Sequence, residues 1–268
     1  MLQHFLNPPN WFTAASIFCS TWAVALLTGG GDASGQLLSR ACILVVFAGI
    51  FDNLDGRVAR LTNRYSDFGV QIDSIADILG FGLAPAMLAW TWKLHHLGLP
   101  GLIATFIYVV CAAFRLARFN VTTQTRSWPL PGHSQGLTST MSGGILVTLV
   151  WMSNGYLSDV LRVPAWALAG FVIALGYLMV SGIPFRNFKD VKHSAVARRY
   201  LALSTACCLM GALAFDVSMW FGVGAALYLL AGLLDGLVVA FRHRMLVAAL
   251  TLTEGPDVDA ADDVEAHR

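Results

Sequence analysis

The sequence predicts an all-α protein, a polytopic transmembrane helical bundle. Of its 268 residues, 56% are hydrophobic and only 12% are charged, and the mean hydropathy is +0.64. A soluble domain of this length cannot bury so much apolar surface. In addition, apolar stretches that approach the roughly 20 residues needed to cross a bilayer as a helix recur along the chain. A membrane is therefore the expected solvent.

About eight membrane spans are expected, and several are short and depend on their flanking residues as much as on length. Their approximate bounds are 12–29, 37–58, 70–92, 101–118, 137–153, 164–183, 200–215 and 219–241. The first ten residues lack the basic segment of a cleavable signal, so we expect the first span to remain. No Gly/Ser linker or internal repeat divides the region. We expect one membrane domain, 1–245, followed by a disordered acidic cytoplasmic tail, 246–268.

The placement of basic residues predicts the orientation, because short cytoplasmic loops are enriched in Lys and Arg. If the N-terminus is cytoplasmic, the loops on that side hold Arg57, Arg60, Arg64, Arg115, Arg118, Arg126, Arg186, Lys189, Lys192, Arg198, Arg199, Arg242 and Arg244. The opposite side keeps Arg40, Lys93 and Arg162. We therefore expect a multi-pass protein of the cytoplasmic (inner) membrane, with both termini facing the cytoplasm.

Four carboxylates stand within two otherwise apolar helical stretches of the segment 51–82. Asp52 and Asp55 are three residues apart, and Asp73 and Asp77 are four apart, so each pair lies on one face of its helix. A hairpin at about 61–67 would bring the two faces together. The sequence therefore predicts one acidic site built by two consecutive helices.

Converging carboxylates repel one another unless divalent cations neutralise them. A ligand set made only of oxygen favours Mg²⁺ or Mn²⁺ over zinc. Two such cations can bridge a diphosphate, while one carboxylate takes a proton from an attacking hydroxyl. Gly56 and Gly69 remove side chains where phosphates or a nucleotide would approach the backbone. The expected chemistry is phosphoryl-type transfer.

The spacing of these residues forms a longer pattern, D-x2-D-G-x2-A-R-x8-G-x3-D-x3-D. Its fixed positions are Asp52, Asp55, Gly56, Ala59, Arg60, Gly69, Asp73 and Asp77. The pattern resembles the signature of the CDP-alcohol phosphatidyltransferase family. The resemblance implies an enzyme with a six-span helical core around a cytosol-facing polar cavity, to which this chain would add two C-terminal spans.

The resemblance also implies roles for individual residues. Asp52, Asp55, Asp73 and Asp77 would bind two divalent cations, Mg²⁺ or Mn²⁺, and Asp77 would also be the general base. The CDP-lipid would contact Gly56, Arg60, Ser66 and Gly69. Ser66 enters because the family often places a small hydroxyl residue six positions after the motif arginine. The implied partners are the membrane lipid CDP-diacylglycerol and a small alcohol; dimers are common in the family, so a homodimer is also implied.

Four further segments resemble the serine-accepting members of the family, the phosphatidylserine synthases. They are 51–62, 73–86, 115–120 and 178–189. This resemblance implies transfer of a phosphatidyl group from CDP-diacylglycerol to the hydroxyl of L-serine, with release of CMP. The stretch 129–144, PLPGHSQGLTSTMSGG, departs from the pattern usual in such synthases. Glycerol 3-phosphate and an inositol phosphate therefore remain alternative acceptors.

Arg115 and Arg118 are expected on the same side of the membrane as the aspartates. Either arginine could bind the carboxylate of serine or a lipid phosphate, and helical spacing does not choose between these ligands. A carboxylate-lined transporter is the alternative from another class, since acids inside membranes also mark ion pathways. It leaves the Gly and Arg spacing unexplained. The Trp and Phe content is typical of interfacial belts, so no nucleic-acid partner is indicated.

Overall fold

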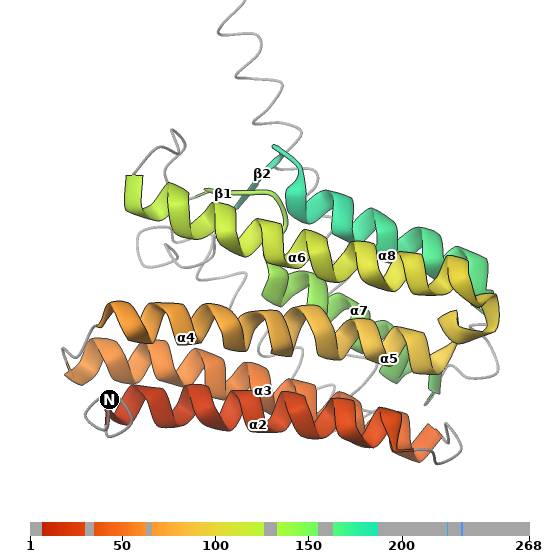
Figure 1. Cartoon of the computed structure of the whole chain (residues 1–268), viewed down its shortest axis with the longest axis horizontal. Helices are drawn as coiled ribbons and strands as arrows, with labels where there is room; N and C mark the ends of the chain where they lie inside the picture. Colours follow the sequence, from red (N-terminus) through yellow and green to blue (C-terminus); the bar gives the residue numbers. More distant parts are fainter. Residues whose placement is uncertain are drawn as a thin grey trace, which may run out of the picture.

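A computed structural model describes most of the first seven-tenths of the chain. The described residues are 7–29, 35–62, 66–125, 133–154 and 163–186, with the single positions 224 and 232. Over these ranges the protein is a bundle of long helices that alternate in direction (Figure 1), which confirms the predicted all-α membrane class. The last two expected spans, apart from positions 224 and 232, and the acidic tail lie outside the described residues. The count of eight spans therefore stays a prediction.

The helices follow the expected spans closely. Their bounds are α2 Pro8–Thr28, α3 Gly35–Thr62, α4 Asp67–Asp77, the π-helix η1 Ile78–Leu83, α5 Ala84–Trp92, the 3₁₀ helix η2 Leu94–Leu97, α6 Leu99–Thr125, α7 Ser139–Asn154 and α8 Ala165–Val180. Four stretches are long and apolar enough to cross a membrane: Pro8–Thr28, Gly35–Thr62, Phe68–Trp92 and Leu99–Thr122. The expected spans 137–153 and 164–183 correspond to α7 and α8, which have 16 residues each.

Local sequence explains where several of these helices begin and turn. Proline occupies the first turn of α2, where its missing N–H is not needed. Ser66 caps α4, because its Oγ accepts a hydrogen bond from the Gly69 N–H at 3.0 Å. At the other end of the bundle Gly98 has a φ of +61°, which favours glycine and lets the chain turn from η2 into α6.

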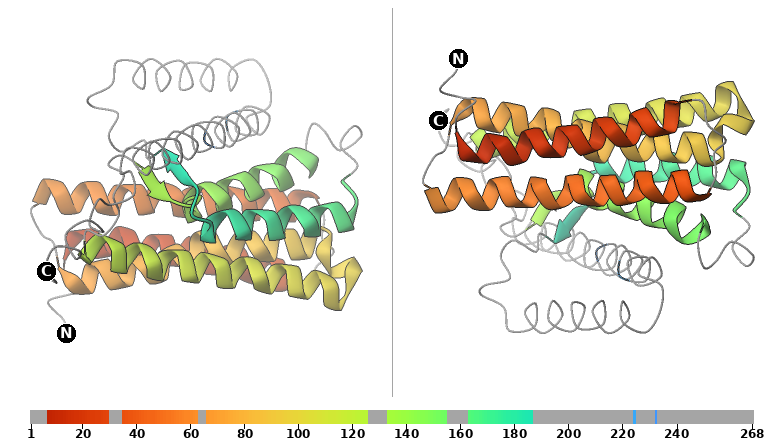
Figure 2. Two further views of the ribbon diagram at one scale, coloured as in Figure 1. Left: turned by 90° about the horizontal axis from the view of Figure 1, so that it is seen from above. Right: turned by 90° about the horizontal axis from the view of Figure 1, so that it is seen from below.

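Two helix pairs form the framework of the bundle. α2 packs along α3, and α6 packs along α8; both pairs lie side by side in the two views of Figure 2. α7 contacts α3 of one pair and both α6 and α8 of the other, and so joins the two pairs. The fully buried side chains between them include Leu88, Tyr108, Leu146 and Leu175. This apolar core fixes how the ends of the helices meet.

A small two-stranded ribbon completes the described fold, and the sequence did not predict it. β1 His133–Gln135 pairs antiparallel with β2 Pro184–Arg186, with Ser134 opposite Phe185. Gly136 follows β1 with a φ of +76°, and a Cβ at that position would clash with the Met179 carbonyl oxygen. The ribbon therefore packs directly on the end of α8. It also uses part of the stretch 129–144 that departs from the family pattern.

Candidate active site

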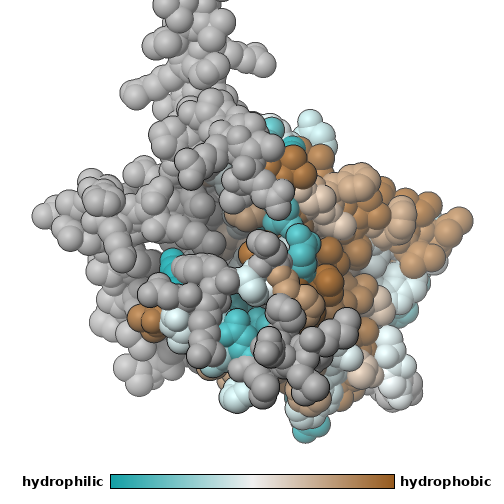
Figure 3. All heavy atoms as spheres, turned by 60° about the vertical axis from the view of Figure 1, so that its left-hand side comes forward, coloured by the Kyte–Doolittle hydropathy of each residue, from teal (hydrophilic) through white to brown (hydrophobic). Residues whose placement is uncertain are grey.

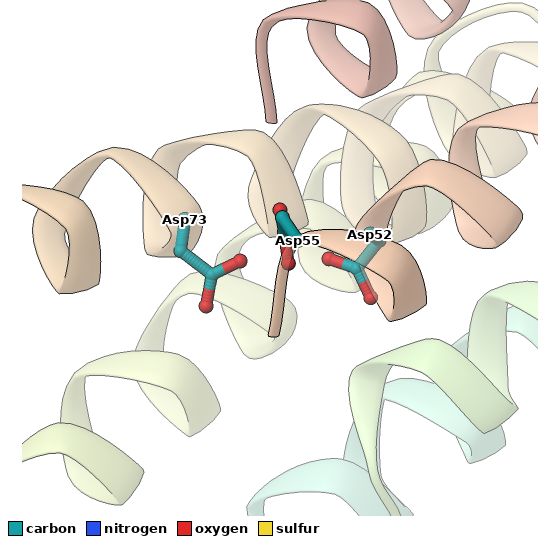
Figure 4. Close-up of side chains that lie close together, drawn as sticks. All are labelled: Asp52, Asp55 and Asp73. Carbon is teal, nitrogen blue, oxygen red and sulfur yellow. The ribbon is translucent and has the colours of Figure 1, made fainter. Parts of the chain in front are cut away.

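Helices α3 and α4 bring the acidic side chains together at one end of the bundle. Asp52 and Asp55 come from the second half of α3, and Asp73 comes from α4. One carboxylate oxygen from each of the three lies within 4.8 Å of those of the other two. Figure 4 shows Asp73 pointing from its helix toward Asp55 and Asp52. The expected hairpin is also observed, since α3 ends at Thr62 and Ser66 caps α4.

Asp77 lies beside this group of three and is not part of it. Its carboxyl group hydrogen-bonds with that of Asp52, and it is close enough to Asp73, Asp55 and Arg115 for electrostatic interaction. Asp77 is also the last residue of α4 before the π-helical turn η1. The four carboxylates that the sequence singled out thus occupy one region, with three in mutual contact range and one adjacent.

The donor set fits a divalent cation. All three carboxylates offer hard oxygen ligands, and they come from two helices that pack against each other. Asp55 is buried, with 6% of its surface exposed, while Asp52 and Asp73 are half-buried. Two carboxylates 4.8 Å apart repel by roughly 3 kcal/mol at an effective dielectric constant near 20. A cation between them would replace this repulsion with attraction.

Sequence reasoning missed Thr13 on α2, which contacts the acidic group directly. Its Oγ1 donates a hydrogen bond to Asp55 Oδ2 at 2.8 Å, and both side chains are buried. Thr13 therefore orients the carboxylate of Asp55 through its Oδ2. The available signal was a stripe of buried polar residues on an apolar helix, Thr13, Ser16 and Ser20, at spacings of three and four.

The residues expected to bind the CDP-lipid stand at the end of α3 and the start of α4, on the two helices that carry the carboxylates. Gly56 lies one residue after Asp55, and a Cβ at Gly56 would meet no atom within 4 Å, so the space beside it is open. Arg60 is exposed, and its Nε donates to the Gly56 carbonyl oxygen at 3.0 Å. Ser66 and Gly69 are joined through the cap of α4. A Cβ at Gly69 would lie 3.1 Å from Ser66 Oγ, so this glycine also serves the local packing.

The two arginines of α6 have different surroundings. Arg115 is buried; its Nη1 donates to Ser139 Oγ at 3.0 Å, and its guanidinium lies 5.2 Å from the ring centre of Phe119. It is also the basic residue that interacts electrostatically with Asp77.

The guanidinium of Arg118 instead binds main-chain carbonyl groups. Nη1 donates to the carbonyl oxygen of Val180 at 2.7 Å, and Nη2 donates to those of Met179, Gln135 and Ser181 at 3.1 to 3.2 Å. These bonds join α6 to the end of α8 and to β1. The structure therefore gives Arg118 a structural task, which the sequence did not predict.

An apolar groove opens along α3 between Val45 and Arg57. It has a volume of about 490 Å³ and lies between α3 and α7, with Phe81 of η1 also in its wall. Asn53, Arg57 and Thr140 supply polar groups to a lining that is otherwise mostly apolar. Figure 3 brings this end of the molecule forward and shows patches of hydrophilic residues beside a hydrophobic flank. A polar site and an apolar groove thus share one helix.

The fold and the site define the class of protein as a helical membrane protein with a candidate metal site of carboxylates near one end of the bundle. The model of the CDP-alcohol phosphatidyltransferase family matches residues 6–179, which include every helix from α2 to most of α8. The chain belongs to the CDP-alcohol phosphatidyltransferase family, as its sequence pattern predicted. Enzymes of this family transfer phosphatidyl groups and use a divalent metal, and the group formed by Asp52, Asp55 and Asp73 is able to bind one.

Several curated relatives are similar over most of the matched region. The chain is 39% identical over 192 residues to a CDP-diacylglycerol–serine O-phosphatidyltransferase of Helicobacter pylori (strain J99). This match covers 70% of this chain and 76% of that protein. A protein of the same name from Bacillus subtilis is 36% identical to this chain, and the match covers 58% of this chain and 78% of that protein. For one from Methanocaldococcus jannaschii the identity is 34%, and the match covers 58% of this chain and 67% of that protein.

Replacement of Thr13 by valine should weaken metal binding. Valine keeps the shape of threonine but removes the hydrogen bond that orients Asp55, and loss of an outer-shell partner typically lowers metal affinity by about 10-fold or more. The metal concentration for half-maximal activity should rise accordingly. Addition of metal should also raise the Tm of the variant by less than it raises the Tm of the wild-type protein. Thr28→Val is the matched control, because the Thr28 hydroxyl bonds only to carbonyl groups of its own helix in the described structure. Equal metal dependence in both variants would contradict the assignment.

Proposed function

We propose that the protein transfers the phosphatidyl group of CDP-diacylglycerol to the hydroxyl oxygen of L-serine. The oxygen attacks the phosphorus that carries the diacylglycerol, the bond from that phosphorus to CMP breaks, and phosphatidylserine and CMP are formed. The observation that carries this proposal is the meeting of Asp52, Asp55 and Asp73 from two helices of the family signature. The names of the curated relatives support serine as the acceptor.

The surroundings of the acidic group suit a donor with a charged head and apolar tails. The open space at Gly56 would admit the diphosphate, and the exposed Arg60 beside it would pair with a phosphate. Ser66 keeps a hydroxyl hydrogen to donate, because its Oγ only accepts in the helix cap. The apolar groove along α3 would take part of a diacylglycerol chain. Head and tail would thus follow the same helix.

We further propose that Asp52, Asp55, Asp73 and Asp77 together hold two divalent cations, Mg²⁺ or Mn²⁺. Bound there, the cations would neutralise the diphosphate and the charge that develops on the departing CMP. Asp77 would take the proton of the attacking hydroxyl, because it stands just outside the group of three and has the buried Arg115 nearby. Arg115 would balance the negative charge of the deprotonated carboxylate.

Arg115 is the better of the two arginines for the acceptor. It lies near Asp77 and bonds to the first residue of α7, whereas both Nη groups of Arg118 already donate to carbonyl oxygens. A guanidinium at Arg115 would attract the carboxylate of serine. It would equally attract the phosphate of glycerol 3-phosphate or of an inositol phosphate, so these acceptors remain the alternatives to test.

The proposed setting is the cytoplasmic membrane, with the active site and both termini facing the cytoplasm. The acidic group lies at the end of the bundle to which Arg57 and Arg60 belong, while Lys93 lies at the other end. Basic residues favour the cytoplasmic side of membrane proteins. CMP would then return directly to the cytoplasm.

Asp55→Asn and Asp73→Asn should each reduce turnover by about a thousandfold or more. The amide is a poor ligand and does not balance the cation, whose contribution to such a reaction is several kcal/mol. The protein should still fold, because each change removes part of the repulsion among the carboxylates. Thermal unfolding should show an unchanged or higher metal-free Tm and little further gain with Mn²⁺. Near-normal turnover in either variant would reject the metal site.

Gly56→Ala should raise the KM for CDP-diacylglycerol by about tenfold, which corresponds to a loss of about 1.4 kcal/mol of binding. Without substrate the added methyl group meets no atom, so the variant should be no less stable than the wild-type protein. The higher helix propensity of alanine should raise the free energy of unfolding by up to about 1 kcal/mol. Gly170→Ala is the matched control, since Gly170 lies inside α8 with equally open surroundings. An unchanged KM in Gly56→Ala would show that CDP-diacylglycerol does not bind beside Gly56.

The whole proposal is tested by CMP release from purified protein in detergent, with CDP-diacylglycerol and Mg²⁺ or Mn²⁺. Parallel reactions contain serine, glycerol 3-phosphate, an inositol phosphate or no acceptor. We expect CMP and phosphatidylserine with serine alone. CMP formed only with another alcohol would keep the chemistry and reject serine as the acceptor. A complete absence of CMP would reject the transferase and favour the transporter alternative.

A further inference from the structure

Phe81 lies where three other helices meet the π-helical turn after Asp77. Its side chain is buried, with 5% of its surface exposed. The edge of its ring lies against Gly49 of α3, where an added Cβ would be 3.4 Å from Cε1 and 3.5 Å from Cζ. The ring therefore fills the space between η1 and the helix that carries Asp52 and Asp55.

The backbone of Phe81 is fixed from two further helices. The buried hydroxyl of Tyr108, on α6, donates to the Phe81 carbonyl oxygen at 3.3 Å. From α7, Gly143 packs so closely that an added Cβ would lie 2.9 Å from the same oxygen and 3.1 Å from Phe81 Cα. Single π-helical turns are frequent at functional sites, and this one is held in place by neighbours on both sides.

These contacts lie one to about two helical turns from the carboxylates. Gly49 precedes Asp52 by three residues, about 4.5 Å along the axis of α3, and Phe81 follows Asp77 by four residues and Asp73 by eight. With its backbone held by Tyr108 and Gly143, the Phe81 ring sets how closely α3 can approach. We infer that Phe81 is a positioning residue that sets the separation of α3 from α4, and with it the spacing between Asp52, Asp55 and Asp73.

This inference rests on the metal site of the proposed function. Oxygen ligands must lie within a few tenths of an ångström of their ideal distance, because Mg²⁺ demands near-octahedral geometry at about 2.0 to 2.1 Å. A smaller or more flexible side chain at position 81 would let α3 shift. The distances between the carboxylates would then vary instead of holding one value. Metal affinity should then fall even though no ligand and no direct neighbour of a ligand has been changed.

The test measures binding of Mn²⁺ alone to purified, metal-free protein in detergent, from the electron paramagnetic resonance signal of free Mn²⁺. Phe81→Leu removes the ring edge and should raise the Mn²⁺ Kd by about tenfold, the lower end of the range for outer-shell changes. Adding Gly49→Ala puts a methyl group on the α3 side of the space that the ring edge leaves, and should recover part of the affinity. Gly49→Ala alone should leave the Kd within about twofold, since its methyl group makes only ordinary contacts.

Two variants separate spacing from general damage to the core. Phe185→Leu makes the same change at a fully buried phenylalanine in the ribbon and should lower the Tm without changing the Mn²⁺ Kd. Phe81→Met keeps most of the side-chain volume but not its rigidity, and should weaken Mn²⁺ binding even if Phe81→Leu does not fold. Unchanged Mn²⁺ binding in the Phe81 variants, or failure of Gly49→Ala to restore it, would overturn the inference. If the wild-type protein bound no Mn²⁺, the metal site itself would fall, and the inference with it.

Discussion

The structure depends on keeping several negative charges together inside an apolar bundle. Carboxylates at 4.8 Å repel, and burial of Asp55 makes its charge more expensive still. Three features of the fold answer this constraint. Thr13 donates to Asp55, Arg115 lies near Asp77, and the three clustered oxygens offer a cation a ready set of ligands. Because a bound cation would relieve the repulsion among the carboxylates, that repulsion favours metal binding.

The same constraint explains why the scaffold around the site is so tightly packed. Acidic helices that repel would move apart unless other elements hold them. On one side α2 supports α3 and supplies Thr13. On the other, Arg118 binds four main-chain carbonyl oxygens and so joins α6 to α8 and the ribbon, which keeps the neighbouring Arg115 in place. Arg118, which donates to carbonyl groups, thus supports the helix that carries Arg115.

The sequence predicted the parts of this design that are set by local pattern. Long apolar stretches predicted the first six spans, which the helices α2 to α8 now form, and the spacing of Asp52, Asp55, Asp73 and Asp77 predicted their place on facing helix surfaces. The parts it missed depend on contacts between distant segments. Thr13 is 42 residues from Asp55, and the carbonyl groups bound by Arg118 become available only where α8 and β1 end together. A helical pattern contains no signal for the π-helical turn or for a three-residue strand.

The position of charge in the bundle bears on the choice between an enzyme and a transporter. Among the described residues, Asp55 and Arg115 are the buried charged groups, and both belong to the same end of the bundle. An ion pathway would be expected to place such groups near the middle of the membrane, between half-helices or along a polar route. Here Leu88, Leu146 and Tyr108 instead fill the bundle beyond the carboxylates. A site that is charged at one end and closed by packing beyond it suits a substrate whose head group arrives from the water and whose tails remain in the lipid.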